Sequence, residues 1–124
     1  MFSYNKVILG GVVCNTPTLR KNESGTSVTN FTLKTTESWK DRNTGVIKRY
    51  SKYHRIVAWG KTAEKVIRIA KKDIIVMVEG KLNYHKNGNN RSTAEVKAYV
   101  IEYKGRLTPR PKPERNNINT EVTK

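Results

Sequence analysis

Residues 52–72 read KYHRIVAWGKTAEKVIRIAKK, and the periodicity of this stretch changes in its middle. Up to Trp59, side chains that alternate between two faces are typical of a half-buried strand. From Ala63 the apolar residues recur at i, i+3, i+4 and i+7, which is typical of an amphipathic helix, here with Thr62 as its N-cap. The stretch therefore predicts a strand followed at once by a helix with a basic outer face.

Further strand signals lie on both sides of this stretch. Residues 7–13 form a short apolar run with two central glycines, which predicts a strand that bends or bulges where backbones approach closely. Two long β-rich runs, 28–39 and 47–59, flank an Asn/Gly turn, and a later pair, 74–84 and 92–103, flanks a second turn. The predicted fold is all-β: a five-stranded OB-fold barrel with one α-helix between strands 3 and 4 and long β-hairpins.

The composition favours a polyanionic partner. The chain has 124 residues, with 25 Lys and Arg against 10 Asp and Glu, so its formal net charge is +15. Such a field concentrates phosphates, and no apolar run approaches the roughly 18 to 20 residues needed to span a bilayer. The single cysteine, Cys14, permits neither an internal disulfide nor a cysteine-based zinc cluster. Nucleic acid is the expected partner, with no membrane and no metal.

Gly, Pro and charge divide the chain into two regions. Residues 1–104 are expected to form the barrel domain. Residues 105–124 contain three of the four prolines and are expected to form a basic, disordered tail. Because the chain opens without the layout of a signal or transit peptide, a cytoplasmic location is predicted, or an organelle matrix if the chain is a processed form.

One face of the second long strand combines aromatic rings with a cation. Tyr53, Arg55 and Trp59 share this face, whereas Ile56 and Ala58 on the opposite face suit a core. The alternative is that both aromatics belong to the barrel core. An unpaired arginine is rarely buried, which favours a solvent-exposed face on which bases can stack.

Trp39 lies at the predicted tip of the first hairpin, among basic and aromatic neighbours. Bases could stack on its ring while nearby cations bind phosphates, and the alternative role is a cross-strand contact that stabilises the hairpin. Tyr84, on the second hairpin, carries a weaker version of the same pattern. The cations near Trp39 are Lys40, Arg42, Lys48 and Arg49.

The sequence offers little for catalysis. His54 and His85 lie in different predicted hairpins, and neither begins a metal-ligand spacing. With 10 acids against 25 bases, few pairs could act as general acid and base, and no Gly-x-x-x-x-Gly-Lys loop is present. A non-enzymatic protein without a cofactor is predicted.

Several motifs, in order across residues 5–103, resemble the bacterial and mitochondrial single-stranded-DNA-binding proteins. They are NKVIL (5–9), PTLR (17–20), GTSVTNFTL (25–33), ESWKD (37–41), YHRIV (53–57), WGKTAE (59–64) and VEGKL (78–82). The resemblance implies an OB-fold, usually a homotetramer, that wraps single-stranded DNA without sequence preference and without catalysis. It further implies a part in DNA replication, recombination and repair.

The resemblance also implies roles for particular residues. Aromatics matching Trp39, Tyr53 and Trp59 stack on bases in that family, and His54 matches a position associated with the subunit interface. The cations expected near the DNA backbone are Lys6, Arg20, Lys40, Arg55, Lys61 and Lys71.

Two departures from the family pattern stand out. Bacterial members usually end in an acidic, Phe-terminated tip that recruits repair enzymes, whereas this chain ends NTEVTK, so recruitment through a tip is not expected. Asp73 replaces the glycine that usually follows the helix. Three other functions stay open from the residues alone: an OB-fold RNA binder, because cations and aromatics serve RNA equally well, an adaptor whose barrel binds protein partners, and a nuclease.

Overall fold

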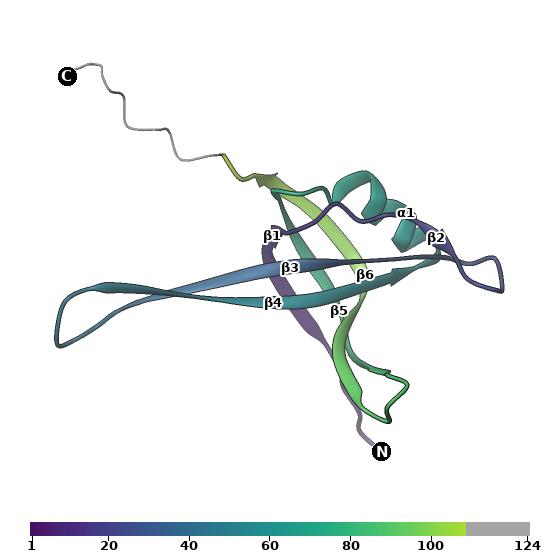
Figure 1. The fold of residues 1–124 in the computed structure, drawn as a ribbon, viewed down its shortest axis with the longest axis horizontal. Coiled ribbons are helices and arrows are strands. Elements are labelled where there is room, and N and C mark those ends of the chain that lie inside the picture. Colours follow the sequence, from purple (N-terminus) through teal and green to yellow (C-terminus); the bar gives the residue numbers. More distant parts are fainter. Residues whose placement is uncertain (109–124) are drawn as a thin grey trace.

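The structure, a computed structural model, describes residues 1–108 as six strands and one helix (Figure 1). The helix comes directly after a long strand, as the change of periodicity predicts. The elements are β1 (Val7–Val13), β2 (Arg20–Lys21), β3 (Ser27–Lys40), β4 (Ile47–Trp59), α1 (Gly60–Ile69), β5 (Ile74–Lys86) and β6 (Ser92–Arg106).

The five long strands close into a barrel. They follow the order β1-β5-β6-β4-β3, and pairing of Val12 with Lys34 and of Val13 with Leu33 joins β1 to β3. The β4–β6 contact is parallel, and all other pairings are antiparallel. The predicted five-stranded barrel is confirmed, and the two-residue β2, which pairs only with β3, is a sixth strand that the sequence did not indicate.

Closure of the barrel depends on Gly11. A Cβ atom at this position would lie 2.1 Å from the backbone carbonyl oxygen of Lys34 on β3, whereas a Cβ at Gly10 would meet nothing within 4 Å. Any side chain at position 11 would therefore push β1 and β3 apart. The predicted close approach of backbones in this strand is confirmed at Gly11.

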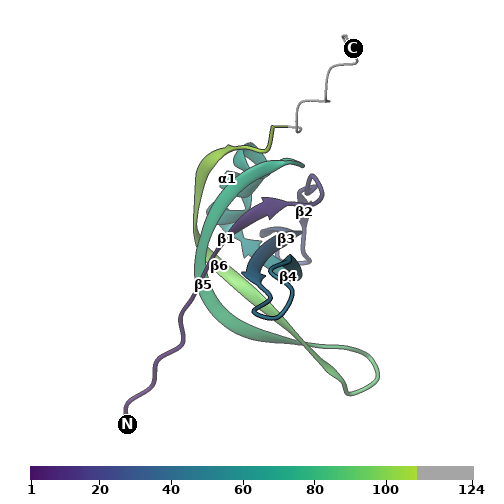
Figure 2. The same ribbon diagram turned by 90° about the vertical axis from the view of Figure 1, so that its left-hand side faces the viewer.

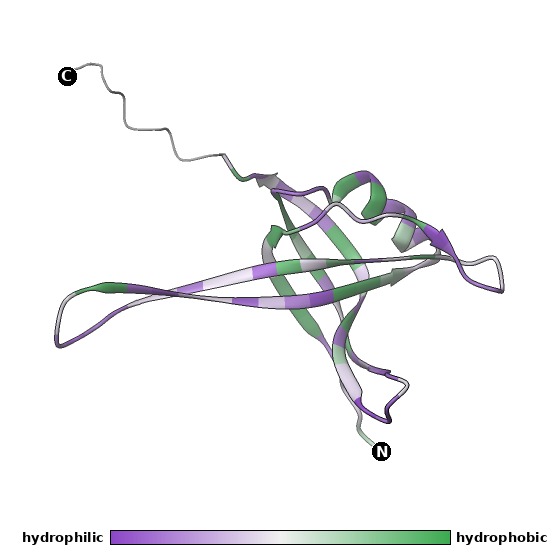
Figure 3. Ribbon diagram, in the orientation of Figure 1, coloured by the Kyte–Doolittle hydropathy of each residue, from purple (hydrophilic) through white to green (hydrophobic). Residues whose placement is uncertain are grey.

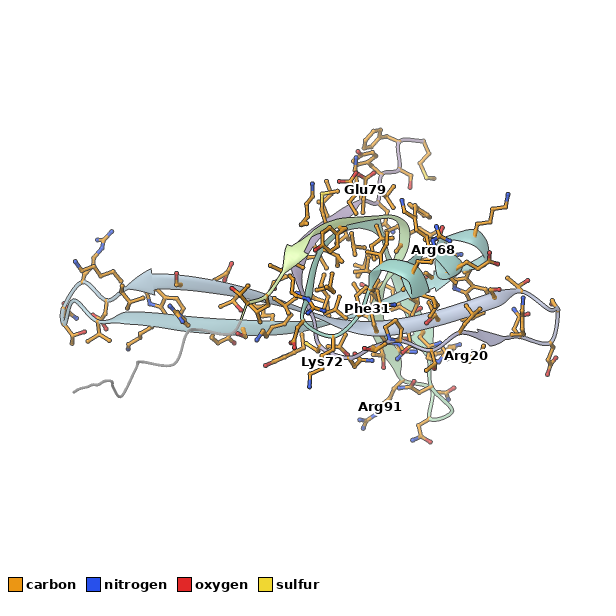
Figure 4. The ribbon with its side chains drawn as sticks, turned by 90° about the horizontal axis from the view of Figure 1, so that it is seen from above. Arg20, Phe31, Arg68, Lys72, Glu79 and Arg91 are labelled. Atoms are coloured by element: carbon orange, nitrogen blue, oxygen red, sulfur yellow. The ribbon has the colours of Figure 1, made fainter. Side chains whose placement is uncertain are left out.

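Apolar side chains from all the long strands fill the barrel, and α1 contributes Ala63 and Val66 to the same core. Phe31, labelled in Figure 4, lies in the middle of this interior. In Figure 3 the hydrophobic colour concentrates on the strands that form the barrel. Full burial of a large apolar side chain contributes roughly 1.5–3 kcal/mol, so this core supplies most of the stabilisation.

Helix α1 begins two residues before the predicted N-cap, so the assignment of Thr62 as N-cap is wrong. The N-cap is Trp59, in an extended conformation with φ −130° and ψ 151°, and no side chain caps the helix. Gly60 has φ 61°, in the left-handed region that glycine reaches at little cost. This conformation lets β4 turn directly into the helix, which leaves no room for a capping residue at 62.

Two hairpins extend from the barrel in different directions (Figures 1 and 2). The β3–β4 ribbon is paired from Val28–Trp59 to Lys40–Ile47, and the β5–β6 hairpin is paired as far as Lys86–Ser92. Both predicted hairpins are therefore present. The β3–β4 ribbon is the longer projection in Figure 1.

The end of β6 is tied to the barrel. It runs to Arg106, past the predicted domain boundary at residue 104, and the Leu107 N–H donates to the Asp73 carbonyl oxygen at 2.8 Å. The rest of the predicted tail, residues 109–124, lies outside the described residues. No helix within residues 1–108 is long and apolar enough to cross a membrane.

Candidate nucleic-acid interface

The outward face of β4 carries the predicted aromatic residues. Tyr53 is 66% and Trp59 45% exposed, whereas Ile56 and Ala58, on the other face, are buried in the core. The predicted alternation is therefore confirmed, and neither aromatic is a core residue. Val57 shares the outward face but is buried, and it lines a hollow together with Trp59 and Arg55.

Arg55 lies between the two aromatics and is held by an acid on β6. Its Nε donates to Oε1 of Glu95 at 3.3 Å, and the Asn83 side-chain amide on β5 donates to Oε2 of the same carboxylate at 2.9 Å. The parallel register that pairs Ile56 with Val96 brings these strands together. Arg55 is therefore an oriented cation, and part of its charge is neutralised before any ligand arrives.

The Trp59 ring already has a cation beside it. The ammonium group of Lys97, also on β6, lies 5.5 Å from the ring centroid, a cation–π distance. The same ammonium is close enough to serve a phosphate next to a base stacked on the ring. Lys97 was not among the predicted site residues, because its position depends on the β4–β6 pairing.

Trp39 lies on the β3–β4 ribbon beyond the barrel, directly across from Lys48. It is 49% exposed, and its ring centroid lies 6.4 Å from that of Tyr50 in a tilted arrangement. The ammonium of Lys52 lies 5.8 Å from the Tyr50 ring centroid. Trp39 thus makes a cross-strand contact and also leaves about half of its surface open, so the contact with Tyr50 does not close the ring to a ligand.

The loop of this ribbon is organised by Asp41. The carboxylate accepts hydrogen bonds from the backbone N–H groups of Asn43 at 2.8 Å and Thr44 at 3.3 Å, and Lys48 lies 3.4 Å away. The two backbone hydrogen bonds, more than the lysine, lower the pKa of Asp41 below its usual range. Lys40, Arg42 and Arg49 are exposed around this loop.

The remaining predicted cations do not form one patch. Arg20, on β2, lines the hollow beside Trp59. Lys6 pairs with Glu79 at 3.4 Å, and Figure 4 shows Glu79 on the opposite side of the barrel from Arg20. Lys61 is exposed at the start of α1, and Lys71 donates to the Ile67 carbonyl oxygen at 3.2 Å after the helix ends.

The second hairpin approaches the same hollow. Tyr84 is 63% exposed, and His85 lines the hollow beside Trp59 together with Arg20. His54 faces the other way: it is half-buried, and its Nε2 lies 2.8 Å from the Thr35 hydroxyl across the ribbon. Within residues 1–108, no group of three or more His, Cys, Asp or Glu side chains could hold a metal ion.

Residues 4–104 match the single-strand binding protein family, which covers most of the chain. The chain belongs to this family. This family member therefore has a closed barrel with one helix, exposed aromatics on β4 and two extended hairpins.

Three solved structures of the single-strand binding protein family are similar to this chain. One, titled Plasmodium falciparum SSB complex with ssDNA, has 27% identity and a TM-score of 0.73, over 84% of this chain and 97% of that chain. The wild-type single-stranded DNA binding protein from Thermus aquaticus has 26% identity and a TM-score of 0.70, over 82% of this chain. A deletion mutant of it carrying R190A has 26% identity and a TM-score of 0.71, over 82% of this chain. This chain spans about half the length of each Thermus chain.

The sequence did not indicate that β5 and β6 contribute side chains to the aromatic face of β4. Glu95, Asn83 and Lys97 reach Arg55 and Trp59 only through strand pairing over a long sequence distance. The one signal available was alternation within β6, which puts Glu95 and Lys97 on one face but does not say which strand lies next to it.

Proposed function

We propose that this chain binds single-stranded DNA without sequence specificity and protects exposed strands during replication, recombination and repair. One observation carries the proposal: on a barrel of the single-strand binding protein family, Tyr53 and Trp59 expose their rings on one strand with the oriented Arg55 between them. Every base has a π-face, so such rings bind strands of any sequence, at roughly 1–3 kcal/mol per stacked base.

The proposed base-stacking residues are Tyr53, Trp59, Trp39 and Tyr84. All four are exposed in the described structure, which supports the proposal. Their dispersal over β4 and both hairpins suits a strand that contacts several surfaces of the barrel in turn. The proposed phosphate contacts are Lys6, Arg20, Lys40, Arg42, Lys48, Arg49, Arg55, Lys61 and Lys71.

Counterion release should add a salt-dependent part of the affinity. On single strands the logarithm of the binding constant falls with the logarithm of salt concentration by about 0.7 for each neutralised phosphate. Because Lys6, Lys48 and Arg55 already have acidic partners at 3.3–3.4 Å, each should contribute less to this slope than an unpaired cation.

We further propose that the chain acts as a homotetramer without catalytic activity, with His54 at a subunit interface. Ile8 on β1, an exposed apolar side chain that pairs across to Glu79 on β5, supports an association surface away from the β4 face. The proposed location is a bacterial cytoplasm, with phage or plasmid association included, or an organelle matrix. Light scattering during gel filtration tests the tetramer, and labelled single strands incubated with divalent metal test for cleavage.

The test of strand binding is a tryptophan-fluorescence titration with oligo-dT at several salt concentrations. Duplex DNA and oligo-U serve as competitors. Strong quenching that survives moderate salt and resists both competitors is expected. Displacement by oligo-U would instead identify an RNA binder. If binding disappears as the salt concentration rises, and duplex DNA binds as tightly as oligo-dT, only a general attraction of polyanions to the +15 charge is left.

A further inference from the structure

A buried carboxylate lies in the middle of the aromatic face. Glu95 is 7% exposed and is the one buried charged residue within residues 1–108. Burial of a carboxylate costs free energy unless the group is paired, and on this face it also repels phosphates. What a carboxylate can offer a bound strand is acceptance of hydrogen bonds from the edge of a base.

The Arg55–Glu95 pair lines two hollows of similar size. One, of about 220 Å³, is also lined by Trp59 and Arg20. The other, of about 190 Å³, is also lined by Tyr53. Arg55 and Glu95 are the residues common to both linings. A base that stacks on either aromatic ring therefore has this ion pair within the same hollow.

The Glu95 carboxylate is fixed in orientation but retains capacity to accept hydrogen bonds. Oε1 accepts from Arg55 Nε at 3.3 Å, and Oε2 accepts from the Asn83 amide at 2.9 Å. An ionised carboxylate offers about four lone-pair sites, so about two are left for a ligand. Because two strands hold it, the group cannot swing away when a base approaches.

Guanine has the base edge that fits a carboxylate best. Its N1–H and its 2-amino group are adjacent donors that can both point to one carboxylate, while its O6 and N7 atoms are the acceptors that arginine recognises. Thymine presents a single N–H flanked by two carbonyl oxygens, which a carboxylate repels. Adenine presents one amino group between the acceptors N1 and N7, and cytosine presents one amino group next to the acceptor N3, so neither offers two adjacent donors.

We propose that Glu95 is a specificity-determining residue that favours guanine in one of the two hollows beside Arg55. The inference rests on the proposed function: the protein binds a single strand without regard to sequence, except that the one base in this hollow is preferably guanine. Arg55 and Asn83 act as positioning residues for the carboxylate.

The test replaces guanine by inosine, which lacks only the 2-amino group. Oligo-dT with isolated guanines is compared with the same oligomer carrying inosine at those positions, by competition against labelled oligo-dT. The native protein should prefer the guanine oligomer about fivefold, the lower end of the discrimination measured for paired base contacts. Equal affinities in the native protein would overturn the inference, whereas failure to bind oligo-dT at all would overturn the proposed function instead.

Variants assign the preference to the carboxylate. Glu95→Gln should bring the guanine-to-inosine ratio close to one, and a ratio that persists in this variant would also overturn the inference. Glu102→Gln is the matched control, because it removes the same charge from an exposed β6 residue that pairs with Lys104 at 3.3 Å. It should keep the ratio. If Glu95→Gln does not fold, Asn83→Ala, which removes one of the two groups that orient the carboxylate, should still lower the ratio, and an unchanged ratio there counts against the inference.

Discussion

Trp39 and Tyr53 lie on opposite faces of the β3–β4 ribbon. Trp39 is paired with Lys48 and Tyr53 with Lys34, and because side chains alternate along each strand, Trp39 shares its face with Tyr50. Both rings are exposed. A DNA strand that stacks on both must therefore follow the twist of the ribbon or pass around its edge.

Single-tryptophan variants can show whether bases reach both faces. Trp39→Phe leaves Trp59 as the one tryptophan in the sequence, and Trp59→Phe leaves Trp39. Oligo-dT should quench both variants strongly, because each tryptophan keeps an exposed ring. Quenching of Trp59 alone would restrict stacking to the β4 face and leave Trp39 with its contact to Tyr50.

Replacement of either tryptophan by alanine separates stacking from charge. Trp39→Ala and Trp59→Ala should each weaken binding of oligo-dT by about 1–3 kcal/mol, with the salt slope unchanged, because a ring but no cation is lost. Titrations at several salt concentrations measure both quantities. Normal binding combined with a lower unfolding midpoint in urea would show that the ring serves packing instead.

Arg20→Ala should reduce the salt slope by about 0.7, the contribution of one phosphate contact. The residue lines the hollow beside Trp59 within the described structure. Lys6→Ala is the comparison, because Lys6 pairs with Glu79 on the other side of the barrel and should change the slope less. Equal slopes for the two variants would contradict a phosphate path along the Trp59 side.

Gly11→Ala should destabilise the barrel by about 3 kcal/mol or more, the upper range for an overpacked site. The new Cβ would lie 2.1 Å from the Lys34 carbonyl oxygen, so β1 would have to leave β3. Gly10→Ala is the matched control, since its Cβ meets nothing within 4 Å and should raise stability by about 0.5–1 kcal/mol. Urea unfolding of both variants measures the difference, and equal stabilities would argue against closure through Gly11.

Asp73→Gly should stabilise the protein by about 0.5–1 kcal/mol. Asp73 has φ 73°, a left-handed conformation that strains most residues and that glycine adopts freely. This strain gives a physical reason for the glycine that the resemblance leads us to expect at this position. Asp73→Asn, which removes the charge but keeps a side chain that tolerates this conformation, should change the unfolding midpoint little. A gain of equal size in both variants would point to the charge at the helix end instead.

Protonation of Asp41 should loosen the hairpin loop at low pH. The pKa of Asp41 is lowered in the folded state by the backbone N–H groups of Asn43 and Thr44, so its ionised form stabilises the loop above the unfolded pKa of 3.8. That contribution is lost as the pH falls through the lower, folded pKa. NMR chemical shifts of the two amides, followed through acid titration, should move in this range, and Asp41→Asn should abolish the transition.

Alternation and turn residues were sufficient to predict much of the barrel. The exposed face of Tyr53 and Trp59, the buried Ile56 and Ala58, and both hairpins followed from local patterns, because side-chain direction in a strand has a period of two. The start of α1 did not follow, since the left-handed Gly60 moved it ahead of Thr62.

The sequence by itself determined which face of β4 is exposed to solvent, which residue types lie on it and the family to which the chain belongs. Only the tertiary structure decided that Glu95 and Asn83 hold Arg55, that Lys97 lies beside Trp59, and that Lys6 and Arg20 lie on different sides of the barrel. The physical reason is that alternation acts within one strand. Which residues lie side by side on neighbouring strands depends on how the barrel closes, which involves residues far apart in the chain. The local sequence pattern therefore cannot predict these neighbours.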